Sequence, residues 1–518
     1  MKTLDLIIIF GYLIGVTAFG SWFGKKQETT EDYFVGDRSV PWWAIAASIV
    51  ATETSTITFI SVPGIAFSKG GNFQFLQLVF GYMLGRIVIS FLFIPMYFKG
   101  ELMTVYELLG TRFGLKVKML ASSLFVVMRN IADGIRLLLT AVVLGAVYVS
   151  FQPGADINTV IIASIVLLGL VMIVFTYYGG MEAVIWVEVI QLGIYIGGAI
   201  AAAIVIASQI EGGFSGAVAI GQQFDKFVLV DWGFRDTVYN FQIPFSSEPF
   251  TFNLPIDLTK TYTFWAGIVG GCFLTMSTHG TDQYLVQRYL CTNKPSRASL
   301  ALLSSGAVVL GQFIGFLFIG VLLFAFYQPY AQAGYETAAG AFPFTGGDKV
   351  FPDFITKHMP SGISGLVVAA IFAAALSSSL NSIAATFVND LYKPFKKNVD
   401  DKHLLRVSHI LTLLFGIVQI GVALVAMKYE SSALDKALAV ASLFNGPVLG
   451  VFLVGTFLKR AGQTAALTGM LVSCVVMVYL RFWTPIAWTW FVLLGSFITF
   501  SVAALVTIFI KNTNEIND

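Results

Sequence analysis

Two polar clusters interrupt long apolar runs of this chain, and their side chains could do chemistry there. The first, A-T-E-T-S-T (51–56), places the carboxylate of Glu53 among four hydroxyl groups. The second, T-M-S-T-H-G-T-D (275–282), comes shortly after the pair Gly270-Gly271. A carboxylate within an apolar run is costly unless it pairs with a base or faces a polar cavity. Each cluster is therefore a candidate for an internal polar site.

The stretch R-N-I-A-D-G-I-R adds three ionisable side chains to another apolar run. Arg129 and Asp133 are four residues apart, as in a helical ion pair. Arg136 has no partner nearby in the sequence, and two roles are open to it. Its guanidinium could bind the carboxylate of a ligand, or it could pair with an acidic residue of another run, Glu53 or Glu188.

Glu188 lies in the apolar sequence W-V-E-V-I-Q. It could pair with a buried arginine, for which Arg86, Arg129 and Arg136 are candidates, or it could serve function directly, since buried carboxylates do both. The four histidines lie at the ends of apolar runs or between them, without the spacing of metal ligands: His279, His358, His403 and His409.

The composition shows what kind of protein must position these residues. The chain has 518 residues, of which 57% are hydrophobic and 12% are charged, and its mean hydropathy is +0.80. Soluble domains carry about 25% charged residues, so the composition indicates a polytopic membrane protein in a lipid bilayer. Neither nucleic acid nor an obligate protein partner is expected. The absence of a Walker A motif and of a nucleophile elbow argues against ATP-driven transport and against an enzyme.

Thirteen apolar runs are long enough to cross a membrane, which takes about 20 residues. They lie near residues 4–23, 41–66, 73–97, 119–150, 157–178, 181–208, 262–287, 299–327, 362–388, 405–427, 434–458, 464–483 and 486–510. The lysines and arginines between them, Arg288 included, concentrate in alternate loops, and such loops face the cytoplasm. The sequence therefore predicts a multi-pass protein of the plasma (inner) membrane, with its N-terminus outside and its C-terminus cytoplasmic.

The spans form two blocks of five, at 41–208 and 262–458, with extra helices at 4–23 and 464–510. An external loop at 209–261, expected to be a lid or a short helical segment, joins the blocks. Because each block has an odd number of spans, the two halves have opposite orientations. The first span of each block contains one polar cluster. Matching breaks in inverted halves are typical of a transporter's substrate site, so we expect both spans to be broken helices.

Four motifs give the chain a resemblance to a known family over nearly its whole length. They are S-I-V-A-T-E-T-S-T-I-T-F-I-S-V-P-G (48–64), Y-G-G-M-E-A-V-I-W-V-E-V-I-Q (178–191), G-T-D-Q-Y-L-V-Q-R-Y-L (280–290) and F-A-A-A-L-S-S-S-L-N-S (372–382). They resemble motifs of the sodium/solute symporter family, in particular bacterial members related to carriers of sugars, sialic acid and monocarboxylates. The resemblance implies an all-α membrane protein of about thirteen transmembrane helices around a five-plus-five inverted-repeat core of the LeuT type.

The resemblance also implies a site for sodium, the coupling ion, between the broken first core helix and the eighth core helix. Its ligands would be the backbone carbonyls of Ala51, Thr54 and Ala374 and the hydroxyls of Ser377 and Ser378. Neutral oxygens suit a hard monovalent cation because they replace its water shell.

Two details of this site stay open. Family members have a longer segment between A-A-A and L-N-S, and an alignment on S-L-N-S would put Ala374 and Ala375 at the hydroxyl positions. Adjacent serines can also bond back to their own helix. Family members often have Asp where this chain has Glu188, which implies that Glu188 supports the sodium site or helps form a second cation site.

Glu53, Ser55, Thr58 and Gln77 match positions that contact the solute in related carriers, and Arg136 and Thr275 complete the expected site. The candidate solute-binding residues are Glu53, Ser55, Thr58, Gln77, Arg136 and Thr275. The core spans hold three acidic and three basic side chains, so a bound sodium ion would favour a neutral or singly anionic solute over a cation.

The expected function is symport, in which inward sodium flux drives uptake of a small sugar-like compound, sialic acid or monocarboxylate by alternating access. A proton-coupled transporter that uses Glu53 or Glu188 is the alternative. A membrane sensor or channel on the same scaffold is the alternative of another class. No signalling domain follows residue 510, and two broken helices favour an occluded site over a continuous pore.

Overall fold

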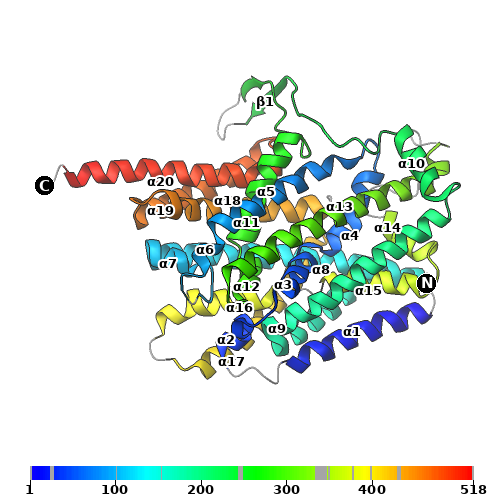
Figure 1. The fold of residues 1–518 in the computed structure, drawn as a ribbon, viewed down its shortest axis with the longest axis horizontal. Coiled ribbons are helices and arrows are strands. Elements are labelled where there is room, and N and C mark those ends of the chain that lie inside the picture. The colour runs from blue at the N-terminus through cyan, green and yellow to red at the C-terminus, as the bar shows by residue number, and fades with distance from the viewer. Residues whose placement is uncertain are drawn as a thin grey trace.

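Nearly all of the described chain is helical (Figure 1). The computed structural model describes residues 3–23, 29–100, 102–152, 154–242, 249–332, 347, 350–375, 379–396, 399–428 and 433–515. The α-helices are α1 (Thr3–Phe23), α2 (Thr30–Val35), α3 (Trp42–Glu53), α4 (Thr56–Phe67), α5 (Leu76–Leu92), α6 (Ile94–Tyr97), α7 (Glu107–Phe113), α8 (Leu115–Phe151), α9 (Ile157–Ser208), α10 (Gly213–Gln223), α11 (Gly271–Gly280), α12 (Gln283–Leu290), α13 (Pro295–Gln332), α14 (Val350–Lys357), α15 (Ile363–Ala375), α16 (Leu380–Thr386), α17 (Asp401–Ala426), α18 (Ala433–Phe457), α19 (Gln463–Trp483) and α20 (Phe491–Glu515). Two antiparallel strands, β1 (Thr237–Phe241) and β2 (Phe250–Leu254), form a hairpin.

The predicted spans coincide with these helices. Each of the thirteen apolar runs overlaps one helix or a set of consecutive helices within the described residues. By length and hydropathy, eight described helices could cross a membrane, or up to nine if the bent pair α3 and α4 is one span. The remaining runs are shorter apolar helices, such as Ile363–Phe372 and Leu443–Phe457, or carry breaks and charges. The positions of the spans were therefore predictable from the sequence. The length of each helix was not, because several spans are short or interrupted.

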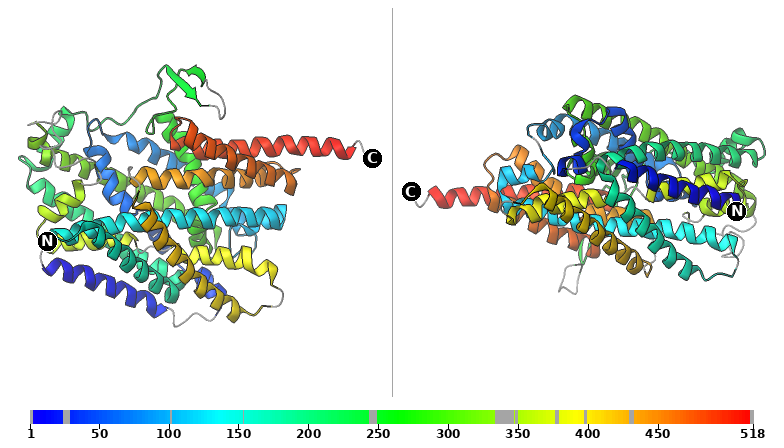
Figure 2. Two further views of the ribbon diagram at one scale, coloured as in Figure 1. Left: turned by 180° about the vertical axis from the view of Figure 1, so that it is seen from behind. Right: turned by 90° about the horizontal axis from the view of Figure 1, so that it is seen from below.

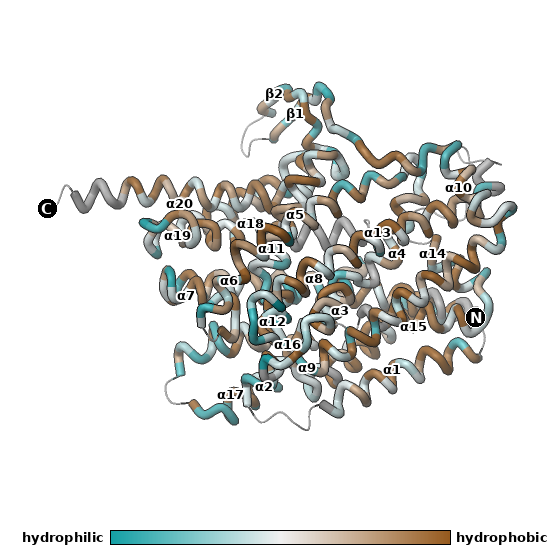
Figure 3. The backbone as a smooth tube through the Cα atoms, viewed as in Figure 1, coloured by the Kyte–Doolittle hydropathy of each residue, from teal (hydrophilic) through white to brown (hydrophobic). Residues whose placement is uncertain are grey.

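The long helices pack alongside one another (Figure 2), and many of their apolar side chains are exposed. Brown predominates along the helices in Figure 3, and teal marks several connecting segments. Phe91 on α5, Ile14 on α1 and Ile410 on α17 are each more than half exposed. Apolar surface on this scale indicates a protein that contacts lipid.

Two predicted spans, 157–178 and 181–208, join without a loop in α9. The chain turns at Gly180, whose φ of 59° and ψ of −174° interrupt the helix. A side chain would be strained at this φ, so glycine allows the second half of α9 to start directly after the first.

The first polar cluster breaks a helix, as predicted. α3 ends at Glu53 and α4 begins at Thr56, and the two helix axes differ by 58°. Thr54 leaves the helical region, with φ −85° and ψ 81°. The N–H of Ser55 donates to the carbonyl of Glu53, so the carbonyl of Ala51 does not receive the helical hydrogen bond from Ser55.

The second polar cluster also contains a break, which lies at its C-terminal end. The π-helical segment η4 (Ala266–Gly270) continues directly into α11. Thr281 then leaves the helix, with φ −134° and ψ 0°. Asp282 starts α12 by accepting the N–H of Tyr284 at 2.9 Å.

Glycines allow α5 and α11 to approach closely. A Cβ at Gly85 would lie 2.6 Å from Cβ of Thr275 and 2.7 Å from the carbonyl oxygen of Cys272. A Cβ at Gly81 would lie 2.1 Å from the carbonyl oxygen of Gly267. Only glycine fits at such separations, and this contact sets the second core helix beside the second broken helix.

The extra N-terminal helix is fastened to α15 by one buried carboxylate. Asp5 of α1 accepts the N–H groups of Gly362 at 2.6 Å and Gly365 at 3.0 Å, and the hydroxyl of Ser364 at 2.8 Å. The first N–H groups of a helix have no acceptor within it. α1 therefore caps the helix that carries Ala374.

The connection between the two halves contains α10 and the β-hairpin, which protrudes from the helical body (Figure 1). The sequence predicted a lid or short helical segment here, and α10 is such a helix, but the hairpin was not predicted. Tyr239 pairs with Phe252 across the strands, and their rings stack at 5.2 Å. Cross-strand aromatic pairs of this kind stabilise short hairpins.

Candidate functional site

A cavity of about 180 Å³ lies beside the break between α3 and α4. Its walls come from α3, α4, α5, α8, α11, α12 and α13. The polar side chains that line it are Thr52, Glu53, Ser55, Thr58, Tyr82, Arg129, Arg136, Thr275, Thr278, His279 and Tyr284. A cavity of this size has room for on the order of a dozen water molecules. Residues next to both breaks line it, so it can hold a small organic solute between the two interrupted helices.

Five of the six predicted solute-binding residues line this cavity: Glu53, Ser55, Thr58, Arg136 and Thr275. They come from α3, the break that follows it, α4, α8 and α11. The sequence did not predict Tyr82, Thr278 or Tyr284 as lining residues.

Gln77 lies elsewhere. Its Nε2 donates to the carbonyls of Gln74 at 3.1 Å and Tyr262 at 3.3 Å, and its Oε1 accepts the N–H of Asp231 at 3.1 Å. Gln77 is not among the residues that line the cavity. The structure therefore gives this side chain a role in holding the connecting segment against α5.

Glu53 is paired with Arg86, a completely buried residue of α5. The sequence named Arg136 as its possible basic partner, and the structure corrects that assignment. His279 completes the group, since its Nε2 lies 3.5 Å from a carboxylate oxygen of Glu53 and 3.4 Å from Nη2 of Arg86. His279, which the sequence placed at the end of an apolar run, lies in the last turn of α11 and lines the cavity.

Both ring nitrogens of His279 have polar neighbours. The hydroxyl of Thr278 donates to the carbonyl of Leu274 at 3.1 Å, and its oxygen lies 2.9 Å from Nδ1 of His279. Nδ1 of His279 is thus held by Thr278, while Nε2 faces both the guanidinium of Arg86 and the carboxylate of Glu53.

Glu188 is paired with Arg288 at 2.6 Å and accepts hydrogen bonds from the hydroxyls of Ser48 and Thr52. None of the three arginines proposed from the sequence is its partner. Arg288, assigned from the sequence to a cytoplasmic loop, is completely buried, and its Nε donates to Ser48 at 2.9 Å. Thr52 lines the cavity, so this group lies directly behind the cavity wall.

Arg129 and Asp133 form only a long ion pair, at 3.8 Å, because Arg129 also bonds closely to Asp282. Of the two roles considered for Arg136, the structure excludes a pair with Glu53 or Glu188 among the described residues. Arg136 lies 3.6 Å from Asp133, and its buried Nη1 has no hydrogen-bond partner among the described residues.

The predicted sodium ligands are described in part. Ala51 and Thr54 lie at the break, and Ala374 lies in the last turn of α15, which contacts α4. Ser377 and Ser378 lie outside the described residues. The next serine, Ser379, donates a hydrogen bond to Asp133, a role that the sequence did not predict.

Comparisons with known proteins agree with this arrangement. A model of the Sodium:solute symporter family matches residues 33–473. The sodium/sialic acid symporter NanT of Aliivibrio fischeri is 30% identical over 517 residues, which cover 98% of this chain and 94% of that protein. The human sodium-coupled monocarboxylate transporter 1 is 27% identical over 483 residues, 92% of this chain and 72% of that protein.

The fold agrees as well. A solved structure of a sodium-coupled sialic acid symporter, in a substrate-bound outward-open state, superposes with a TM-score of 0.82 at 28% identity and covers 98% of both chains. This match confirms the predicted helical transporter fold, and the family is one of transporters rather than enzymes. From its family match, its fold and the cavity between its two broken helices, the chain belongs to the sodium:solute symporter family.

Proposed function

We propose that this chain takes up a small solute that carries one carboxylate, of the sialic acid or monocarboxylate kind, together with sodium. The observation that carries the proposal is Arg136, whose buried Nη1 has no hydrogen-bond partner among the described residues and which lines the cavity. A guanidinium fork fits a carboxylate well. The hydroxyls of Ser55, Thr58 and Thr275 line the same cavity and can bind the polar groups of the solute.

The charges around the cavity support a singly anionic solute. Four acid–base pairs surround it: Glu53 with Arg86, Glu188 with Arg288, Asp282 with Arg129, and Asp133 with Arg136. In the last pair, Nη1 of Arg136 lies 3.6 Å from Asp133, which is beyond hydrogen-bond distance. A sodium ion adds one positive charge, which a carboxylate would neutralise and a cationic solute would oppose.

We assign sodium to the carbonyls of Ala51, Thr54 and Ala374 and the hydroxyls of Ser377 and Ser378. The missing helical bond to Ala51 favours this, because an unwound carbonyl is free to bind an ion. Glu188 would support the site, not form a second one, since Arg288, Ser48 and Thr52 already occupy its carboxylate.

The two carboxylates considered for proton coupling, Glu53 and Glu188, are each paired with an arginine. Neither is therefore a free proton acceptor, and sodium coupling is favoured. The distribution of basic residues supports an N-terminus outside and a cytoplasmic C-terminus, with solute and sodium entering from the side of the β-hairpin.

Uptake into proteoliposomes tests the proposal. We expect a sodium gradient, and not a potassium gradient, to drive uptake of sialic acid or a short monocarboxylate, with inhibition by carboxylates but not by their amides or by choline. Arg136→Gln should weaken carboxylate binding about 10- to 100-fold, since hydrogen bonds to charged groups contribute about 1.5–3 kcal/mol. Sodium-dependent thermal stabilisation without solute should persist in this variant. Inhibition by cationic analogues alone would contradict the proposal.

A further inference from the structure

The segment that follows α10 contains a buried lysine, Lys226, which binds the C-terminal end of α4. Nζ of Lys226 donates to the carbonyls of Ala66 at 3.0 Å, Phe67 at 3.2 Å and Ser68 at 2.8 Å. The side chain of Lys226 is only 2% exposed. Its three N–H donors thus match three carbonyls at a helix end, where carbonyls lack partners within the helix.

This cation is balanced without a carboxylate. No ion pair among the described residues includes Lys226, and the ring of Phe324 on α13 lies 4.1 Å from its Nζ. The ionisable neighbours are engaged elsewhere or face solvent: Asp225 is exposed, and the hydroxyl of Tyr327 donates to Asp353 at 3.0 Å. The negative end of the α4 dipole is therefore the charge that Lys226 meets.

The next residues tie the same segment to two more helices. The carbonyl of Val228 accepts the N–H of Phe73, just before α5, at 3.1 Å. The N–H of Asp231 donates to Gln77 of α5, and its carbonyl accepts the N–H of Phe264, which precedes η4 and α11, at 2.6 Å. Residues 226–231, here called the strap, thus contact the ends of α4, α5 and the segment that leads into α11, with Lys226 also against α13.

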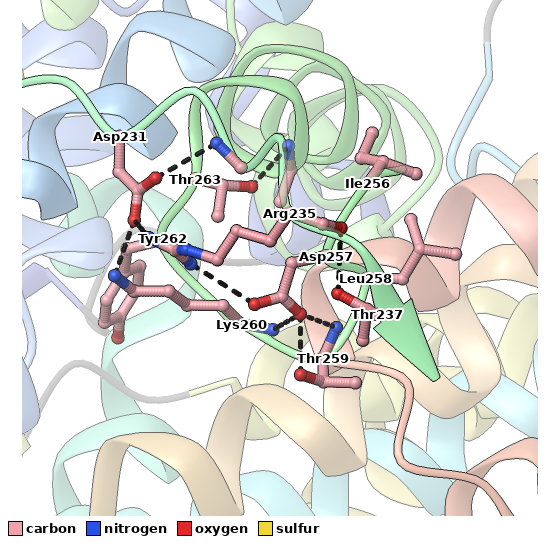
Figure 4. A network of polar contacts seen from close by, with 12 residues as sticks. Asp231, Arg235, Thr237, Ile256, Asp257, Leu258, Thr259, Lys260, Tyr262 and Thr263 are labelled. Carbon is pink, nitrogen blue, oxygen red and sulfur yellow. Dashed lines mark hydrogen bonds and ion pairs between the residues drawn. The ribbon is translucent and has the colours of Figure 1, made fainter. Parts of the chain in front are cut away.

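The far end of the strap is fixed by charges (Figure 4). The carboxylate of Asp231 accepts hydrogen bonds from Lys260 at 2.5 Å and Arg235 at 2.8 Å, and Arg235 also reaches Asp257. Partial burial raises the pKa of Asp231, but these hydrogen bonds outweigh it and bring the pKa to about 2. The strap therefore keeps this anchor throughout the physiological pH range.

We propose that Lys226 is a positioning residue for solute binding: by holding the outer end of α4 it keeps Ser55 and Thr58, at the other end of that helix, in place at the cavity. The role of these two residues in solute binding rests on the proposed function.

Three variants test the role of the charge. Lys226→Met keeps the apolar stem but removes the donors, Lys226→Arg keeps the charge, and Lys69→Met changes an exposed lysine at the same end of α4 as the control. Lys226→Met should raise the KM for the carboxylated solute about tenfold, within the effect of a cation at a helix C-terminus, and leave the maximal rate within about twofold. Lys226→Arg and Lys69→Met should transport like the unmodified protein.

The pH profile separates positioning from simple structural support. Burial lowers the pKa of Lys226 to about 8, so the ammonium loses a proton, and one donor, as pH rises from 7 to 9. The KM of the unmodified protein should therefore rise over this interval. The Lys226→Arg variant, whose side chain stays charged, should have a flat profile. Identical profiles in the two proteins would overturn the proposal.

Amide hydrogen exchange of the purified protein without solute gives a readout that does not depend on the substrate. Exchange in the last turn of α4 should accelerate in Lys226→Met and not in Lys226→Arg. Faster exchange together with no uptake of any carboxylate by the unmodified protein would uphold the anchor and reject the proposed substrate. Unchanged exchange and unchanged KM in Lys226→Met would reject the positioning role.

Discussion

Arg288 shows what one buried charge demands of the core. It is completely buried, bonds to Glu188 at 2.6 Å and Ser48 at 2.9 Å, and lies over the ring of Tyr284. Two desolvated charges gain little net stability from each other, but removal of one leaves the other uncompensated. Loss of one member of the pair should therefore destabilise the protein more than loss of both.

Arg288→Met should lower the free energy of unfolding by about 3–5 kcal/mol, because Glu188 is left buried without its main partner. The double variant Glu188→Leu with Arg288→Met should recover most of that loss. Thermal unfolding of the detergent-purified proteins would measure both, with Arg460→Met at an exposed position as the control. A double variant as unstable as the single one would contradict this account.

At the residue scale, the sequence predicted which side chains line the cavity better than it predicted their partners. Glu53 and Arg136 were identifiable because ionisable groups in apolar runs are rare. The partners of Glu53 and Glu188 were not, because these contacts are long-range: Glu53 meets Arg86, and Glu188 meets Arg288, 100 residues away in the chain. Arg288 follows the break at Asp282, so hydropathy alone placed it in a loop.

At the scale of elements, the contact between α5 and α11 controls the width of the cavity. Tyr82 on α5 and Thr275 on α11 both line the cavity, and the helices meet through Gly81 and Gly85. Any side chain at these glycines would push the helices apart, because the neighbouring atoms include backbone that cannot rotate away.

Gly85→Ala should destabilise the protein by about 1–3 kcal/mol, as overpacking of a core does, and should reduce uptake. The matched control is Gly311→Ala on α13, where a Cβ would meet nothing within 4 Å. This change should be neutral, or stabilising by up to about 1 kcal/mol, because alanine restricts the unfolded chain. Melting temperatures and uptake rates of the two variants would check the difference, and equal behaviour would refute it.

The breaks in the first core helix of each half were predictable, because a polar cluster marks each break in the sequence. The hairpin was not, because β1 and β2 have five residues each and short strands depend on pairing rather than on their own propensity. The junction in α9 was missed for a related reason, since Gly180 changes the chain direction without a polar loop.

At the scale of the whole molecule, the span count, the inverted halves and the motifs predicted the fold and the family. The full set of charged side chains around the cavity could be counted only in the structure. The sequence counted three acids and three bases in the core spans. The structure adds Asp282 and Arg288 to them, one of each sign. Acids and bases around the cavity are again equal in number among the described residues, and the preference for a neutral or anionic solute stays a prediction.

The four acid–base pairs around the cavity carry a consequence for the response to membrane potential. A site without net charge contributes nothing to charge movement, so the cargo alone decides whether transport is electrogenic. One sodium ion with one monocarboxylate moves no net charge, and under the proposed assignment Glu188, already paired with Arg288, binds no second sodium ion. Uptake should therefore keep the same rate at every imposed potassium diffusion potential. A second sodium ion would instead make uptake faster at inside-negative potentials, with about 2.3 kcal/mol of added driving force per 100 mV.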